Sequence, residues 1–198
     1  MNTHLHASWS DGDAFRENWR PLHDAEEFFL LSCYVSTTGW DELDSILSQS
    51  TGLRHAMLFF SMEGLSAVEI SHQVEAIYAL VGKQRPSGTT VQAFLILDRG
   101  RALFHPKAHA SRSRRHSRVV VGSANLTGAG LRTNYELISV IDDDEHVYHQ
   151  FIDLINGLPN AAHVVCVNDT PRQDMLRYAQ GRAPLPSSST ESSTSPVR

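Results

Sequence analysis

The amino-acid sequence predicts an α/β sandwich built around a central mixed, largely parallel sheet. Short apolar runs rich in β-forming residues alternate with segments of helical period, which is the pattern of strands connected by helices. Two neighbouring strand-like runs joined by a polar loop add a hairpin, so we expect the sheet to be mixed. The chain has 198 residues, of which 41% are hydrophobic, and it is therefore large enough to bury a sizeable core.

The first half of the chain carries three expected strands and two expected helices. Residues 27–35 (EFFLLSCYV) form an apolar run of strand length, and residues 55–60 and 90–97 share that character. Residues 41–47 predict a short helix, because three of their apolar side chains lie on one helical face. Residues 65–81 predict a longer helix, whose inward face is expected to contain Val68, Val74, Ile77, Tyr78 and Val81.

The second half begins with the hairpin, whose strands are expected at residues 102–110 and 118–123. The remaining expected elements are a strand at 135–141, a helix at 145–158, a strand at 162–167 and a closing helix at 171–179. Apolar residues three and four apart define the core face of the first of these helices. They are Val147, Tyr148, Phe151, Leu154, Ile155 and Leu158.

The end of the chain has a different composition. Residues 183–198 are rich in Ser, Thr and Pro and almost free of apolar side chains, so we expect them to be disordered. We therefore expect one folded domain over residues 1–182, followed by a tail that is either a linker or an end.

Composition and charge exclude several classes of protein. A formal net charge of −5 gives no general attraction to nucleic acid or membranes, so a polyanion site requires locally clustered charge. No stretch approaches the ~20 consecutive apolar residues of a membrane helix, and the N-terminal residues lack the pattern of a signal peptide. Cys33 and Cys166 lie in apolar runs and are too few for a zinc site. We expect them to be buried free thiols of a cytoplasmic protein.

The residues that can carry chemistry cluster around the hairpin. In a strand, alternate residues share a face, so His105, Lys107 and His109 are expected to project together. An imidazole can act as nucleophile or proton carrier near neutral pH, and a lysine supplies positive charge for an anionic oxygen. The next strand ends with Ser123 and Asn125, which add a hydroxyl and an amide. By spacing alone, the pattern favours a strand pair whose charged loop contains histidines over a catalytic site.

These residues resemble the signature of the phospholipase D superfamily. That signature pairs His-x-Lys with a downstream Gly-Ser-x-Asn, here His-Pro-Lys at 105–107 and Gly-Ser-Ala-Asn at 122–125. The continuation through Asn134 and Glu136 is most similar to the nuclease branch, which includes metal-independent restriction endonucleases with one motif per chain. The resemblance implies a phospholipase D-like αβα sandwich.

The resemblance also implies a role for each motif residue. His105 would be the nucleophile that forms a phosphohistidine intermediate. Lys107 and Asn125 would bind phosphate oxygens, Ser123 would form a hydrogen bond near the histidine, and Glu136 would orient its imidazole. The resemblance implies no metal and no cofactor.

Two features depart from the family pattern. The Asp that often follows the Lys is missing, and Arg112 occupies its nominal place, which narrows the resemblance to members that rely on the later Glu. Pro106 cannot donate a hydrogen bond to a sheet, so we expect a bulge or an unpaired position there.

The chain has a single His-x-Lys motif, whereas the reaction requires a second acid and base. Superfamily members with one motif obtain it by pairing two chains. The resemblance therefore implies a twofold homodimer with the active site at its interface.

Charged runs around the hairpin have two readings each. The loop arginines either form a solvated tip or grip a nucleic-acid backbone without reading its sequence. An acidic run at 142–144 could belong to a metal cluster, but Asp144 is better placed to cap the following helix. Trp40 is expected to pack rather than to stack on a base. The loop arginines are Arg112, Arg114, Arg115 and Arg118.

Together these expectations describe a cytoplasmic, homodimeric, metal-independent nuclease that hydrolyses DNA or RNA, with a role in restriction or defence suggested by the resemblance. One alternative is a phospholipid hydrolase on the same fold, although the chain has no obvious membrane-binding stretch. The other is an inactive nucleic-acid-binding module, which the complete motif disfavours.

Overall fold

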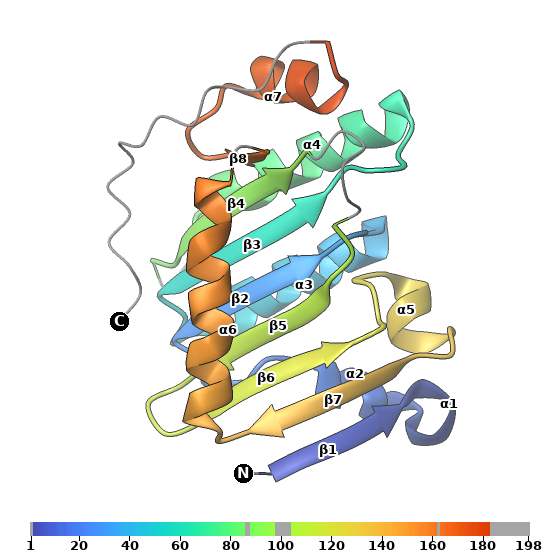
Figure 1. The fold of residues 1–198 in the computed structure, drawn as a ribbon, viewed down its shortest axis with the longest axis vertical. Coiled ribbons are helices and arrows are strands. Elements are labelled where there is room, and N and C mark those ends of the chain that lie inside the picture. Colours follow the sequence, from blue (N-terminus) through green and yellow to red (C-terminus); the bar gives the residue numbers. More distant parts are fainter. Residues whose placement is uncertain (1, 86–87, 98–103, 162, 183–198) are drawn as a thin grey trace.

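The computed structural model describes residues 2–85, 88–97, 104–161 and 163–182. Within these ranges the chain forms one eight-stranded sheet with the order β1-β7-β6-β5-β2-β3-β4-β8 (Figure 1). The tail expected at 183–198 and the first residues of the strand expected at 102–110 lie outside the described residues. The strands are β1 (Asn2–Ala7), β2 (Glu27–Ser32), β3 (His55–Ser61), β4 (Thr90–Ile96), β5 (Lys107–Arg112), β6 (Ser117–Gly122), β7 (Leu137–Asp142) and β8 (Val164–Cys166).

Helices cover both faces of the sheet, so the fold has the three layers of the expected αβα sandwich. One face packs against α2, α3, α4 and α7, and the other packs against α6, which crosses the strands (Figure 1). None of the helices in the described ranges has the length and apolar character needed to cross a membrane. The helices are α1 (Ser8–Asp11), α2 (Asp13–Trp19), α3 (Thr37–Gln49), α4 (Ala67–Gly82), α5 (Gly128–Arg132), α6 (Glu145–Gly157), the 3-10 turn η1 (Leu158–Asn160) and α7 (Arg172–Ala179).

The sheet is mixed, as expected, but it is mostly antiparallel, so the expectation of a largely parallel sheet is wrong. In the described sheet only β2–β3 and β3–β4 pair in parallel, and the other five pairings are antiparallel. A hairpin joins β5 to β6, and β7 returns beside β6 after the short helix α5. Both edge strands, β1 and β8, also run antiparallel to their neighbours. The connections from β5 to β6 and from β6 to β7 need fewer residues than the crossover helix that parallel neighbours require.

Local signals in the sequence account for where the longer helices begin. The side chains of Ser36 and Asp144 each accept a backbone N–H from the first turn of α3 and α6, as was expected of Asp144. Ser66 and Glu69 form a reciprocal capping box at the start of α4. Each cap satisfies backbone donors that the helix itself leaves unpaired.

Several expected details are corrected by the structure. Val68 and Leu154 are 65% and 71% exposed, so neither belongs to the core. Val68 precedes the buried Val74 by six residues, which places it on another side of α4. The elements β1, α1, α2 and α5 were not anticipated. Pro106 lies immediately before β5 and therefore occupies no position in the sheet.

The strand directions bring several ends together at one edge of the sheet. The carboxyl ends of β1, β2, β3 and β6 meet the amino ends of β5 and β7 there (Figure 1). This edge carries the residues that the sequence analysis identified.

Candidate active site

The two halves of the motif lie beside each other at this edge. His105 and Lys107 stand at the beginning of β5, and Ser123 and Asn125 follow the end of β6. Because β5 and β6 are antiparallel neighbours, the start of one strand lies next to the end of the other. The hairpin therefore unites residues that are more than fifteen positions apart in the sequence.

His105 and Lys107 are in direct contact. The Nζ atom of Lys107 lies 2.7 Å from Nδ1 and 2.9 Å from Nε2 of His105, and it donates to the carbonyl oxygen of His105 at 3.2 Å. The imidazole is exposed and the lysine is half-buried. An exposed imidazole beside a fixed ammonium group is a suitable arrangement for attacking an anionic phosphodiester.

Ser123 and Glu136 form a second contact at the same edge. The Ser123 hydroxyl donates to Oε2 of Glu136, and Nδ2 of Asn134 donates to Oε1 at 3.3 Å. The carboxylate is 8% exposed, so both of its oxygens are satisfied in a nearly buried position. Among the described residues no hydrogen bond joins Glu136 to His105, so the carboxylate holds Ser123 and Asn134 rather than the imidazole.

Asn125 is oriented by a residue that the sequence analysis treated as a buried thiol. The thiol of Cys33 donates to Oδ1 of Asn125 at 2.8 Å, which leaves the amide N–H groups of Asn125 as donors. Both cysteines are free, and both are half-buried rather than buried. Because Cys33 follows β2, this bond also ties the end of β2 to the loop after β6.

Two glycines allow this loop to pack closely against its neighbours. A Cβ at Gly39 would stand 1.9 Å from the backbone oxygen of Leu126, and one at Gly130 would stand 2.5 Å from that of Asn125. Neither position tolerates a side chain without movement of the backbone. The close packing against Asn125 therefore accounts for glycine at position 130.

Ser8 is a site residue that the sequence analysis missed. Its hydroxyl accepts from the backbone N–H of Glu136 at 2.9 Å and donates to the carbonyl of Asn134 at 2.5 Å. Its own backbone N–H donates to the carbonyl of Glu136 at 2.9 Å. Ser8 thus fixes the segment that carries Glu136. The available signal was the alternation of polar and apolar residues in THLHA before it, which is typical of a strand.

The basic loop lies at the opposite end of the hairpin from His105 and Ser123. The six residues of β5 separate the two ends by about 20 Å. Three of the arginines are also paired with acids: Arg112 with Glu145 at 3.2 Å, Arg114 with Glu26 at 2.9 Å, and Arg118 with Asp142 at 2.7 Å. Arg115 is exposed. Nucleic-acid binding by these arginines stays a prediction, in which they contact the backbone several nucleotides away from the site.

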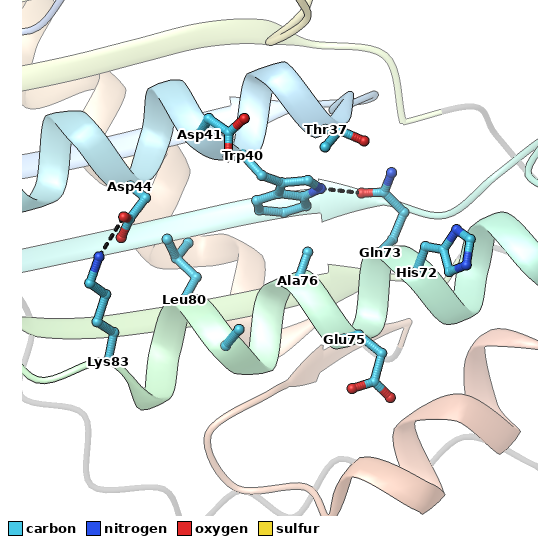
Figure 2. A pocket seen from close by; sticks show the side chains of 11 residues that line it. Thr37, Trp40, Asp41, Asp44, His72, Gln73, Glu75, Ala76, Leu80 and Lys83 are labelled. Carbon is cyan, nitrogen blue, oxygen red and sulfur yellow. Dashed lines mark hydrogen bonds and ion pairs between the residues drawn. The ribbon is translucent and has the colours of Figure 1, made fainter.

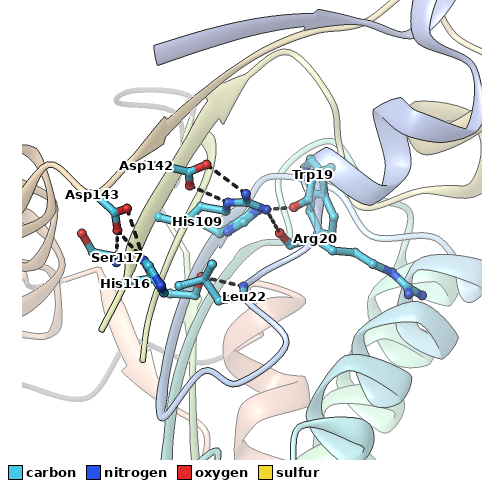
Figure 3. Close-up of polar contacts among 10 residues, drawn as sticks. Trp19, Arg20, Leu22, His109, His116, Ser117, Asp142 and Asp143 are labelled. Carbon is cyan, nitrogen blue, oxygen red and sulfur yellow. Dashed lines mark hydrogen bonds and ion pairs between the residues drawn. The ribbon is translucent and has the colours of Figure 1, made fainter. Parts of the chain in front are cut away.

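His109 shares the strand of the motif but belongs to the core. It is 1% exposed, its Nε2 donates to the carbonyl of Trp19, and its ring meets the Trp19 ring edge-on at 5.0 Å (Figure 3). Burial lowers the pKa of His109 from 6.5 to about 4, and the hydrogen bond to Trp19 opposes this only in part. His109 is therefore neutral at pH 7 and does not project with His105 into the site.

A groove of about 600 Å³ lies between α3 and α4, away from the motif residues (Figure 2). Trp40 lies in this groove, where its Nε1 donates to Gln73 at 2.8 Å, and its ring packs edge-on against Phe60 at 4.8 Å. Trp40 is thus a packing residue, as expected. No residue of the motif lines this groove.

No family model matches the sequence, and no curated protein matches it significantly. Among solved structures the chain is similar to NucT from Helicobacter pylori, with 14% identity over 79% of this chain and 94% of the other and a TM-score of 0.54. It is similar to Nuc from Salmonella typhimurium, a phospholipase D family member, with 15% identity over 79% of this chain and 92% of that one and a TM-score of 0.54.

A polyphosphate kinase from Porphyromonas gingivalis matches over 90% of this chain but only 28% of its own, with 13% identity and a TM-score of 0.51. At such identities the comparisons establish the architecture and leave the chemistry to the site residues. The similarity to Nuc, a phospholipase D family member, covers most of both chains. The chain therefore has a phospholipase D-like fold.

Proposed function

We propose that the chain is a phosphodiester hydrolase that cleaves nucleic acid, with DNA as its substrate. The observation that carries this proposal is the contact of Lys107 with His105 at the sheet edge where Ser123 and Glu136 also meet. This edge belongs to a phospholipase D-like fold. The resemblance described above implies that the motif carries the phosphodiester site in proteins of that superfamily.

In the first step a ring nitrogen of His105 attacks the phosphorus. A P–N bond forms while the P–O bond to the leaving strand breaks, and the leaving oxygen takes a proton from a second imidazole. The ammonium of Lys107 and the amide N–H groups of Asn125 stabilise the negative charge that develops on the non-bridging oxygens. In the second step water gives a proton to the second imidazole, attacks the phosphorus and releases His105.

The second imidazole is proposed to come from another copy of the chain. The motif supplies one imidazole per chain, and His109 is unsuited because it is buried and bonded to Trp19. A twofold dimer would place His105 of each copy on either side of one phosphodiester. Light scattering under active conditions tests this, since a purely monomeric active enzyme would contradict the shared site.

The proposed reaction needs no metal ion, because Lys107 and Asn125 supply the positive charge and the donors that an ion would otherwise provide. The residues that meet at the site are nitrogen and hydroxyl donors, and the carboxylate of Glu136 is already bonded to Ser123 and Asn134. Glu136 thereby keeps Ser123 in place beside the nucleophile strand.

We infer a reducing, cytoplasmic setting from Cys33. Its thiol donates to Asn125, and that bond requires the sulfur to be reduced. A role in restriction or defence is part of the same proposal and rests on the resemblance to metal-independent restriction endonucleases.

The proposal is tested by incubating the chain with single- and double-stranded DNA and, separately, with phosphatidylcholine vesicles. We expect cleavage of DNA that His105→Ala abolishes, whereas His149→Ala, which alters an exposed histidine on α6, leaves it unchanged. Hydrolysis of the lipid but not of DNA would identify a phospholipase instead. Binding of DNA without any cleavage would identify an inactive module.

A further inference from the structure

Two exposed aromatic side chains stand side by side at the edge that carries the candidate site. Trp9 is 60% exposed and Tyr135 is 85% exposed. Their ring centroids lie 6.1 Å apart with the planes tilted by 51°. Because the rings are not stacked flat on each other, their faces remain open to a third aromatic group.

The backbone places this pair next to the proposed chemistry. The pairing of β1 with β7 ends at Ala7 and Leu137, and the hydrogen bond from Ser8 to the carbonyl of Glu136 extends it by one step. Trp9 and Tyr135 follow at the next position, each directly adjacent in the chain to one partner of that bond. Consecutive Cα atoms are about 3.8 Å apart, so the backbone of Tyr135 lies within one residue of that of Glu136. A nucleic-acid strand bound at Ser123 would therefore come within reach of the two rings after a few nucleotides.

We propose that Trp9 and Tyr135 form a stacking subsite for an unpaired base of a single-stranded substrate. Every base has a π face that can stack on an aromatic side chain, whatever its sequence. In a duplex those faces are covered by the neighbouring base pairs, so only an unpaired base can occupy the subsite. The inference rests on the proposed function and adds a preference for single-stranded nucleic acid to it.

A second copy of the chain is the competing occupant of this surface. Leu5, Val121 and Leu137 are 71%, 47% and 45% exposed and lie on the three neighbouring strands β1, β6 and β7. Aliphatic side chains bury area against a protein but offer no π face to a base. Substitution of an aromatic residue by leucine therefore distinguishes a bound base from a second copy of the chain, because it keeps an apolar side chain and removes the ring.

The experiment measures binding of a labelled single-stranded oligonucleotide by fluorescence anisotropy, with His105→Ala in the background to prevent cleavage. We expect Trp9→Leu and Tyr135→Leu each to weaken binding by about 5- to 100-fold, the effect of losing one stacked base. Trp9→Phe and Tyr135→Phe, which keep a ring, retain most of the affinity. Leu5→Ala, which removes an exposed aliphatic group from the same surface, leaves it unchanged.

An abasic position in the oligonucleotide provides the matching change on the ligand. Moved along the strand, it should weaken binding at one place, and there the Trp9→Leu and Tyr135→Leu variants should show no further loss. Affinity for a fully paired duplex should differ little between these variants and the parent.

The outcomes separate this inference from the proposed function. Unchanged single-strand affinity in both leucine variants overturns the subsite while cleavage by the unmodified chain stands. Loss of binding in Leu5→Ala as well, together with dissociation of a dimer in sedimentation velocity, assigns the surface to a second copy and also overturns it. If binding weakens at one abasic position but the unmodified chain cleaves no nucleic acid, the subsite is supported and the proposed hydrolase function is refuted. Failure to bind any nucleic acid refutes both.

Discussion

The buried imidazole of His109 makes the strand that carries the motif sensitive to acid. Its Nε2 donates to Trp19, and its Nδ1 is buried without a partner among the described residues, so protonation would place an unpaired cation there. The nearby charge of Arg118 adds to the cost. Since β5 carries Lys107 two residues before His109, loss of this packing would also displace the site.

The magnitude follows from the two pKa values of His109. In the unfolded chain it binds a proton below pH 6.5, whereas in the folded chain it does so only below about 4. Between these values the unfolded state binds more protons, so the free energy of unfolding rises with pH. The contribution of His109 to that free energy is complete above pH 6.5 and is lost as the pH falls towards 4. On lowering the pH from 7 to 4.5, His109 alone should remove about 2 kcal/mol.

The assay is urea unfolding followed by circular dichroism at pH 7 and pH 4.5, applied to the parent and to His109→Gln. Glutamine can donate to Trp19 but does not titrate in this range. The difference between the two proteins therefore isolates His109 from the carboxylates that also titrate. Parallel losses of stability in both proteins would refute the reasoning.

Two further substitutions probe the loop and the segment around the site. Gly39→Ala places a Cβ 1.9 Å from the carbonyl oxygen of Leu126 and should lower the free energy of unfolding by about 1–3 kcal/mol in thermal denaturation. Gly82→Ala, where a Cβ meets nothing within 4 Å, should not, and equal effects would contradict the packing account. Ser8→Ala removes both hydroxyl contacts to the Glu136 segment and should reduce the rate of DNA cleavage about tenfold, with recovery in Ser8→Thr. Ser10→Ala, which removes an exposed hydroxyl of the same helix, serves as the control, and a Ser8→Ala enzyme as fast as it would refute the positioning role.

The central strands and the long helices could be predicted because their signals are local. β2, β3 and β4 are apolar runs of strand length, and α6 begins at a residue suited to capping it. The pairing of strands depends on contacts between distant segments, so the parallel content could not be obtained in the same way. Short elements such as α1 and α5 carry too few residues to show a period.

The site was only partly accessible to sequence analysis. The motif residues from His105 to Asn125 meet at one edge because they flank the two strands of a single hairpin. The same reasoning would have placed the loop at the far end, since a hairpin has its turn at one end and its open ends at the other. The bonds from Ser8 and Cys33 join segments that no local pattern connects.

The most direct test of the account is the rate of DNA cleavage in excess EDTA. The proposed mechanism assigns the charge and donors to Lys107 and Asn125 and the covalent step to His105. It therefore predicts that chelation leaves the cleavage rate unchanged and that His105→Ala abolishes cleavage under the same conditions. Loss of cleavage on chelation, restored by adding a divalent metal ion, would contradict it.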